Sequence, residues 1–295
     1  MLQVDIEYLK GAKRRKSYGV VWIMIILAIL GIFMVLPLVY LVSTAFKPPE
    51  ELFLYPPRFF VSHPTMKNMT DLINATSSSL VPFTRYLFNS ILVSAVTVSL
   101  LVIISSMACY PLAKHKFPAK AFIFNLITIS LMFAPEVVDI PRFLVIANLH
   151  IMNTYWALIL PGLAFPTGLF LMKQFLEQVP DDIFEAAKID GASEMQMFKN
   201  IALPLIRNAQ ATVVILSFTG IWNDASTSTT YIQTDQLKSL AFYMSTITGA
   251  GAAAAGVARQ GAAAAATFIM TIPTVLMFIL QQSRVMETMA HSGIK

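Results

Sequence analysis

Six long apolar segments constrain the fold of this chain more than any other feature. A helix needs about twenty mainly apolar residues to cross the hydrocarbon core of a bilayer. Segments near that length lie at residues 19–45, 86–113, 121–140, 155–176, 206–223 and 261–282. Inside lipid the backbone polar groups must be satisfied within the chain, which favours helices over open sheets. The sequence therefore predicts an all-α integral membrane protein with six transmembrane helices.

The composition excludes a soluble globular protein. Apolar residues make up 56% of the chain and charged residues only 13%, so most of its surface faces lipid. A basic run from Lys10 to Lys16 precedes the first apolar segment, as in a signal peptide, but that segment is longer than a signal-peptide core and no small-residue cleavage site follows. We expect a basic N-terminus over residues 1–18, a six-helix domain over 19–282 and a C-terminal tail over 283–295.

The distribution of Lys and Arg predicts the orientation, because these residues are retained on the cytoplasmic side. With six crossings both termini lie on one side, and placing them inside gives the cytoplasm most of the cations: Lys10, Lys13, Arg14, Arg15, Lys16, Lys114, Lys116, Lys120, Lys173, Lys188, Lys199, Arg207, Arg284 and Lys295. The outer side then holds Lys47, Arg58, Lys67, Arg85, Arg142, Lys238 and Arg259. Membrane sidedness explains the net charge of +5, and no aromatic and basic surface supports nucleic-acid binding.

The inner segment at residues 177–205 is predicted to form two short helices. Asp182 with Glu185, and Ser193 with Gln196, have the spacing of capping boxes. Gly191 lies between them and supplies the turn. The first helix offers apolar positions at Ile183, Phe184 and Ala187, and the second at Met195, Phe198 and Ile201. Such stripes beside charged positions suit helices that dock on a surface.

The same segment resembles the E-A-A motif of binding-protein-dependent ABC importers, which is E-A-A, three residues, G, nine residues and I-x-L-P. The matching residues are Glu185, Ala186, Ala187, Asp190 within the spacer, Gly191, Ile201, Leu203 and Pro204. The resemblance implies a type I ABC importer permease fold in a bacterial or archaeal cytoplasmic membrane. It also implies that this loop is the coupling element that docks in a groove of an ATPase subunit, with Glu185 contacting an Arg there. The alternative is an ordinary amphipathic cytoplasmic loop.

Two further stretches are candidates for the solute path. Trp222-Asn223-Asp224 resembles the W-N-D or W-N-E signature of maltose-type permeases; the Trp face suits stacking on a sugar ring, and the polar side chains suit hydrogen bonds to hydroxyls. The alternative is an aromatic anchor at the membrane interface. Pro135 and Pro141 flank Glu136, so the third segment should break near the outer face and give way to an exposed amphipathic stretch. Glu136 would form a lip over the path or lie at the interface.

Outside the spans, residues 47–85 are rich in proline, and we expect extended structure there, either a partner's docking surface or a tether. Residues 249–266 are rich in Ala and Gly, which favours close packing of the last helix against a neighbour; the alternative is a moving gate that uses the smooth surface of the tract. The tail from Gln281 resembles the ending of maltose-type permeases, although residues 285–291 depart from it.

The chain has no phosphate-binding G-x-x-x-x-G-K-[ST] motif and no catalytic or paired-cysteine motif, so an enzyme is not expected. The resemblance implies that it binds no cofactor itself, and that ATP and magnesium act on partner subunits. The implied partners are a homologous second permease subunit, two ABC ATPase subunits, an extracytoplasmic solute-binding protein and membrane lipid. The expected cargo is a sugar or oligosaccharide, with glycerol-phosphate or a polyol as the alternatives. The alternative class of protein is an ion-coupled secondary transporter.

Overall fold

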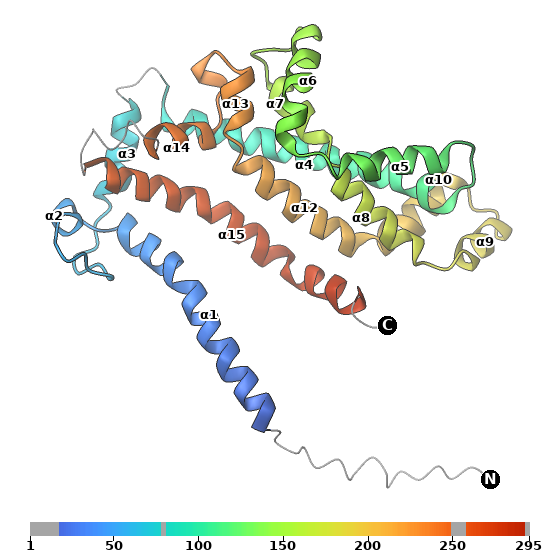
Figure 1. Ribbon diagram of the computed structural model, residues 1–295, viewed down its shortest axis with the longest axis horizontal. Coiled ribbons are helices and arrows are strands. Elements are labelled where there is room, and N and C mark those ends of the chain that lie inside the picture. Colours follow the sequence, from blue (N-terminus) through green and yellow to red (C-terminus); the bar gives the residue numbers. More distant parts are fainter. Residues whose placement is uncertain (1–17, 78–80, 249–257, 293–295) are drawn as a thin grey trace.

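A computed structural model describes residues 18–77, 81–248 and 258–292, and the described chain is helical without strands. The helices are α1 (Tyr18–Ala45), α2 (Pro49–Leu52), α3 (Lys67–Ser77), α4 (Phe83–Lys114), α5 (Lys120–Ser130), α6 (Pro135–Asn148), α7 (Tyr155–Leu163), α8 (Pro166–Glu177), α9 (Asp182–Ile189), α10 (Glu194–Met197), η2 (Phe198–Ala202), α11 (Leu203–Leu205), α12 (Arg207–Trp222), α13 (Ser226–Tyr231), η3 (Asp235–Leu237), α14 (Leu240–Thr248) and α15 (Ala258–Ser292). Helices α4, α12 and α15 form the long body, and α1 diverges from it (Figure 1).

Four of the predicted spans are confirmed by length and composition. Within the described residues, the helices long and apolar enough to cross a membrane are Gly19–Ala45, Phe83–Lys114, Tyr155–Glu177 and Gln260–Ser283. The third of these joins α7 and α8 across a short break. A fifth span is reached when Glu194–Leu205 and Arg207–Trp222, which meet at 70°, are taken together. The chain therefore has the helices of a multi-pass membrane protein.

The prediction of one continuous span over residues 121–140 is wrong. Helix α5 ends at Ser130 after 11 residues, which is about 16 Å and shorter than the hydrocarbon core of about 30 Å. The chain restarts at α6 with Pro135 in its first turn, because proline lacks the N–H that would continue a helix but is tolerated at its start. The expected break and the exposed stretch after it are confirmed, but the break comes earlier than residue 140.

The predicted fifth span is also shorter as a single helix. Helix α12 has 16 residues, about 24 Å, and the chain bends before it at Ile206, two residues after Pro204. In the outer segment, the expectation of extended structure fails for α3, which forms an 11-residue helix in a stretch without proline.

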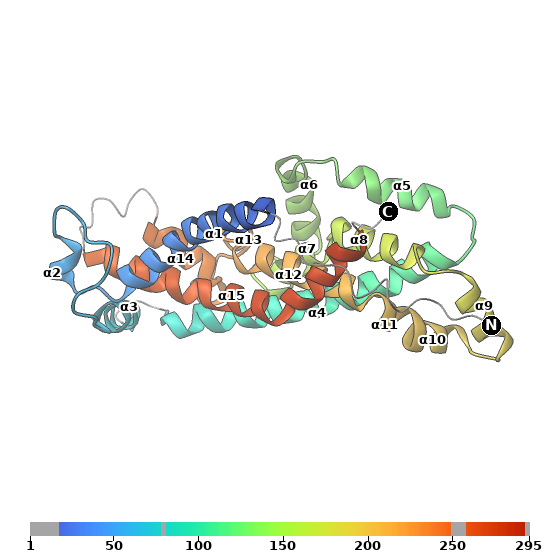
Figure 2. The same ribbon diagram turned by 90° about the horizontal axis from the view of Figure 1, so that it is seen from below.

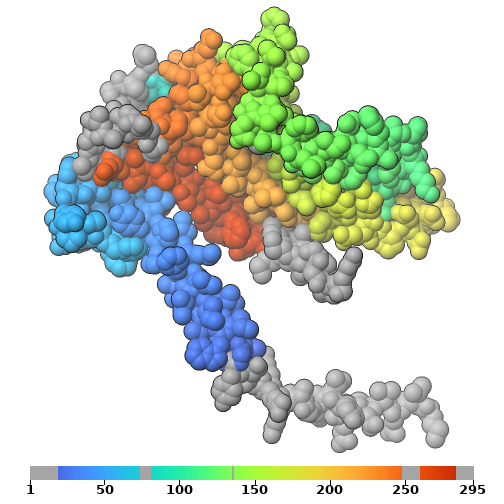
Figure 3. Space-filling view, in the orientation of Figure 1, coloured from blue at the N-terminus to red at the C-terminus, as the bar shows by residue number. Residues whose placement is uncertain are grey.

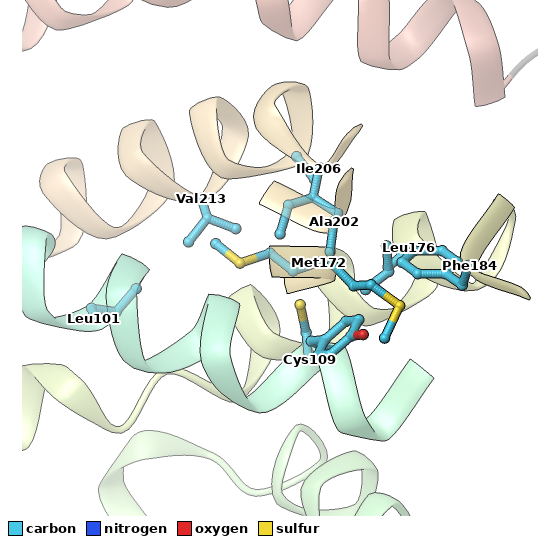
Figure 4. Packing of buried hydrophobic residues seen from close by; sticks show 11 residues of the cluster. Leu101, Cys109, Met172, Leu176, Phe184, Ala202, Ile206 and Val213 are labelled. Carbon is cyan, nitrogen blue, oxygen red and sulfur yellow. The ribbon is translucent and has the colours of Figure 1, made fainter. Parts of the chain in front are cut away.

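Helix α4 holds the bundle together through apolar and polar contacts. Its apolar side chains enter three buried clusters, and Figure 4 shows the one shared with α8 and α12. Cys109 lies in that cluster as a buried free thiol. The Asn89 amide donates hydrogen bonds to the carbonyls of Gln236 at 2.8 Å and Lys238 at 2.9 Å. These bonds join α4 to η3 and to the residue that follows it.

Small residues allow close approach where helices cross. A Cβ added at Gly168 in α8 would lie 2.9 Å from Val213 in α12, and one at Gly162 would lie 2.7 Å from Thr97 in α4. In the Ala and Gly tract, Ala265 is fully buried against neighbouring helices, which confirms tight packing for the described part of the tract. Residues 249–257 lie outside the described residues, as do residues 1–17 and the tail side chains from Arg284 onward, whereas the α15 backbone runs unbroken to Ser292.

Candidate functional site

The candidate site is the loop from α9 to α11, at one end of the molecule and opposite α2 and α3 (Figures 1 and 2). Helix α9 ends in a turn centred on Gly191, whose φ of +82° is left-handed. The Gly191 N–H donates to Lys188 O at 3.1 Å, and the Ala192 N–H donates to Ala187 O at 2.9 Å. This is the Schellman motif that ends many helices, and glycine suits it because it has no Cβ. The predicted two helices with a turn at Gly191 are confirmed.

One of the two predicted capping boxes is present. The Ser193 N–H donates to Gln196 Oε1 at 2.7 Å, and the Gln196 N–H donates to Ser193 Oγ at 3.4 Å. The box predicted from Asp182 and Glu185 is wrong: α9 begins after Asp181, and no side chain caps its first turn. Glu185 instead lines the cavity described below.

Lys114 explains why Asp181 does not cap α9. The Lys114 ammonium, at the end of α4, donates to Asp181 Oδ1 at 2.7 Å and to Val179 O at 2.5 Å. It also lies 5.3 Å from the centre of the Phe184 ring. The hydrogen bond and charge of Lys114 lower the pKa of the Asp181 carboxyl. These contacts fasten the start of the loop to α4.

A second set of contacts fastens α10 to the same end of α4. The Tyr110 hydroxyl donates to Glu194 Oε2 at 3.0 Å, and His115 Nε2 lies 3.0 Å from the same oxygen. The Tyr110 ring is packed edge-on against His115 and lies 6.0 Å from Phe184. Between these attachments and α9 is an open cavity of about 320 Å³, lined by Glu185 among others.

One face of the loop is packed against the core and the other is exposed, and the predicted apolar stripes are divided between these two faces. Phe184 is buried and Ala187 is half-buried against the core, whereas Ile183 is exposed. In the second half, Phe198 and Ile201 pack inward and Met195 is exposed. The prediction that each set forms one docking stripe is therefore wrong.

The motif residues follow the same division. Glu185, Ala186, Asp190 and Gly191 are exposed at the tip, and so is Pro204 at the other end of the loop. Ile201 and Leu203 are half-buried against the core. The exposed face of the loop thus combines the charged Glu185 and Asp190 with small and apolar residues, and its other face is packed firmly against the core.

The loop continues into the membrane helix without an extended connection. After α10 the helix widens into the π-helical turn η2, in which the Leu203 N–H donates to Phe198 O. Pro204 follows in α11, and the Ile206 N–H donates to Ala202 O at 3.1 Å. The chain then bends into α12. A displacement of α10 would therefore be carried through helical turns to α12.

The structure places Trp222 in the core. Its side chain is 2% exposed, its Nε1 donates to Met270 O at 2.9 Å, and its ring stacks on Phe218. Neither face of the indole is accessible, so the hypothesis that it stacks on a sugar does not fit this structure. The interface-anchor alternative fails for the same reason.

The polar residues after Trp222 have different surroundings. The exposed Asn223 amide donates to Thr219 O at 2.9 Å. The half-buried Asp224 accepts the Thr227 N–H at 3.1 Å and so stabilises the start of α13. Asp224 also lines a polar cavity of about 20 Å³, which has room for one water. Glu136 lies exposed in the first turn of α6.

The sequence matches the family described as "Binding-protein-dependent transport system inner membrane component" over residues 101–283. The chain belongs to this family. The matched range contains the whole loop from α9 to α11, so the resemblance based on the E-A-A residues is confirmed at the level of the family. The chain is accordingly a multi-pass ABC transporter permease subunit.

Relatives of this permease are similar along most of their length. It is 28% identical over 296 residues to the arabinooligosaccharides transport system permease protein AraQ of Halalkalibacterium halodurans, covering 96% of this chain and 99% of AraQ. It is 32% identical over 201 residues to the sn-glycerol-3-phosphate transport system permease protein UgpE of Yersinia enterocolitica, covering 67% and 71%.

A chain from the crystal structure of a bacterial ABC transporter involved in the import of the acidic polysaccharide alginate shares the fold of this permease. The TM-score is 0.74 at 18% identity, covering 90% of this permease and 95% of that chain. The ABC importer permease fold is therefore shown for this chain.

Sequence reasoning missed the contacts that position the loop. The sequence singled out Lys114 only for its charge, yet Tyr110 and Lys114 both bind the loop from more than 60 residues away. Their position at the end of a predicted span, facing an inner loop, was the only available signal. Asn153 was also missed: its Oδ1 accepts the N–H groups of Gln233 and Thr234, which joins the connection between α6 and α7 to the segment after α13.

Proposed function

We propose that this permease is one of two homologous subunits that form the path of an ATP-driven importer for a sugar or oligosaccharide. In this proposal two ABC ATPase subunits bind the ATP and magnesium, and an extracytoplasmic binding protein delivers the solute. The observation that carries the proposal is the loop from α9 to α11, whose polar motif residues are exposed on a turn fixed by Gly191. That arrangement suits a surface that another subunit grips and moves.

The mechanism follows from how the loop is attached. Closure of the ATPase pair would push on α9 and α10, with Glu185 paired to an Arg of the ATPase. The loop cannot yield independently, because the Lys114–Asp181 and Tyr110–Glu194 contacts join it to α4. The helical connection through Pro204 carries the same push to α12. The two central helices would then rotate together and switch access from one side to the other.

The orientation and the number of crossings are part of the proposal. Both termini and the loop lie in the cytoplasm of a bacterium or archaeon, as the Lys and Arg distribution favours. Helices α5 and α12 are each too short to span the bilayer alone. Six crossings therefore require that each of them crosses the membrane together with the bent segment beside it. The position of the loop at the end opposite α2 and α3 supports this topology (Figure 1).

The solute proposal rests on the relatives and on the size of the cavities. AraQ supports an oligosaccharide and UgpE supports glycerol-phosphate as the alternative, with a polyol as a further one. The 20 Å³ cavity beside Asp224 is much smaller than the several hundred Å³ of a typical ligand site. The cavity beside Asp224 is therefore too small to hold the solute, and we propose that Asn223, Asp224 and Glu136 line a path between two permease subunits.

Glu185→Ala tests the coupling proposal. The variant should lower the recovery of the ATPase subunit with the membrane complex at matched expression. Because no side chain caps the first turn of α9, a loss of recovery cannot be explained by a lost cap. Asp71→Ala, at an exposed acid on α3, is the matched control and should not change recovery. Equal recovery with Glu185→Ala and the control would refute the contact assigned to Glu185.

A further inference from the structure

The loop at residues 53–61, between α2 and α3, exposes an unusual set of large apolar side chains. Tyr55 is 94% exposed and Phe60 is 68% exposed. The exposed members are Phe53, Leu54, Tyr55, Phe59 and Phe60. The only charged residue in the loop is Arg58. Apolar groups gathered in this way mark an interaction surface.

The loop lies beside the last two turns of α1. Ser43 Oγ donates to Phe59 O at 2.9 Å, and the Tyr40 and Phe59 rings are 5.5 Å apart. Helix α1 ends at Ala45, so Ser43 and Tyr40 lie about 3 and 7.5 Å from its end along the axis. The loop has therefore turned back to the depth at which a membrane helix enters the headgroup region.

A groove joins the loop to the exposed apolar surface of α1. It has a volume of about 370 Å³ and an almost entirely apolar lining, formed by Leu38, Val39, Val42, Ser43, Phe60 and Val61. Most side chains of α1 before this groove are exposed and apolar. The groove thus opens onto the exposed apolar surface of α1, which projects from the rest of the chain (Figure 3).

Polar contacts hold the loop in this position. The buried Glu51 carboxylate accepts the N–H groups of Ser62 at 3.0 Å and His63 at 2.9 Å. The backbone hydrogen bond from Ser62 is the main cause that lowers the pKa of Glu51, so the carboxylate stays charged at neutral pH. The Lys47 ammonium, also buried, donates to Arg58 O. The apolar side chains are therefore exposed by a fixed loop.

We propose that loop 53–61 inserts into the lipid headgroup and acyl boundary of the leaflet at the Ala45 end of α1, and that the groove beside Phe60 holds an acyl chain. The inference rests on membership of a multi-pass membrane family and holds for either orientation of α1. Aromatic side chains favour this boundary. An amphipathic element there is buried by about 5–10 Å, which is similar to the distance from the Ala45 end of α1 at which Phe59 contacts that helix. Arg58 can extend its charge to the phosphate layer.

Site-specific fluorescence in the full-length chain tests this proposal. The single cysteine, Cys109, is buried and is replaced by alanine. Phe60→Cys is labelled with an environment-sensitive dye, and the protein is reconstituted in phosphatidylcholine and phosphatidylglycerol vesicles. A fraction of the lipid carries a nitroxide near the top of the acyl chain. Ile32→Cys, exposed in the middle of α1, is the control for lipid contact. Asp71→Cys, exposed on α3, is the control for water contact.

The nitroxide lipid should quench the label at position 60 several-fold more than the label at position 71. Iodide in the water should quench the label at position 60 less than the label at position 71. Tyr55→Cys should behave like Phe60→Cys, which guards against a local defect of one variant. Equal nitroxide quenching at Phe60 and Asp71 would overturn the proposal. So would a label that iodide reaches freely until a loaded solute-binding protein is added, because that result would make the loop a protein-docking surface.

Discussion

Gly191→Ala should reduce transport about tenfold without changing the amount of protein in the membrane. An added Cβ at Gly191 would meet no atom within 4 Å, and the φ of this residue is +82°. The effect is therefore one of backbone conformation alone, about 1–2 kcal/mol for a residue with a Cβ in the left-handed region. A difference of about 1.4 kcal/mol changes an equilibrium tenfold. The equilibrium between this turn and competing conformations would shift against the turn by that factor, and transport would fall with it.

Three substitutions at this position give a graded test. Asn tolerates left-handed φ and should keep most of the activity, Ala should lose about tenfold, and Val should abolish uptake because β-branched residues are genuine outliers there. Gly220→Ala is the matched control: this glycine is helical and also has open space around it, so the change should be neutral or stabilise by about 0.5–1 kcal/mol. Uptake into proteoliposomes is measured at equal membrane levels. Normal uptake by Gly191→Val would refute the reasoning.

Three further predictions concern packing and attachment. Gly168→Ala should lower the free energy of unfolding by about 1–3 kcal/mol, because the new Cβ would lie 2.7 Å from Phe165 and 2.9 Å from Val213; an unchanged melting temperature would contradict the close packing around Gly168. Tyr110→Phe removes the hydrogen bond to Glu194, which should lower the free energy of unfolding by about 1 kcal/mol and increase proteolysis within α10. Unchanged cleavage would argue against the attachment of α10 through Tyr110. The pKa of Asp181 is lowered by Lys114, so this ion pair contributes at neutral pH and is lost as the pH falls through the lowered pKa. Loop cleavage in wild type should therefore rise at acid pH, whereas Asp181→Asn should show high cleavage at every pH; an equal acid response in both would exclude this pair.

Local sequence signals predicted much of the fold. Apolar length found four spans, because burial in lipid demands a length that few other structures need. The Gly191 turn and the Ser193 capping box were predictable since both depend on residues within a few positions of each other.

Contacts between distant residues explain the failures. Asp182 and Glu185 have the spacing of a capping box, but Lys114 holds Asp181 and the helix starts without one. Apolar length also extended the third span past Ser130, where the chain leaves the helix before Pro135. The burial of Trp222 against α15 depends on a helix 48 residues away, which no local pattern reveals.

The most direct test of the account is ATP hydrolysis by the complex of this permease with its candidate ATPase and sister permease, reconstituted in lipid. Hydrolysis is compared with and without the solute-binding protein and a panel of sugars, glycerol-phosphate and polyols. The account predicts strong stimulation by one loaded binding protein, and the loss of that stimulation in Gly191→Val. A chain that recovers no ATPase yet transports solute alone down an ion gradient would contradict it and establish the secondary-transporter alternative.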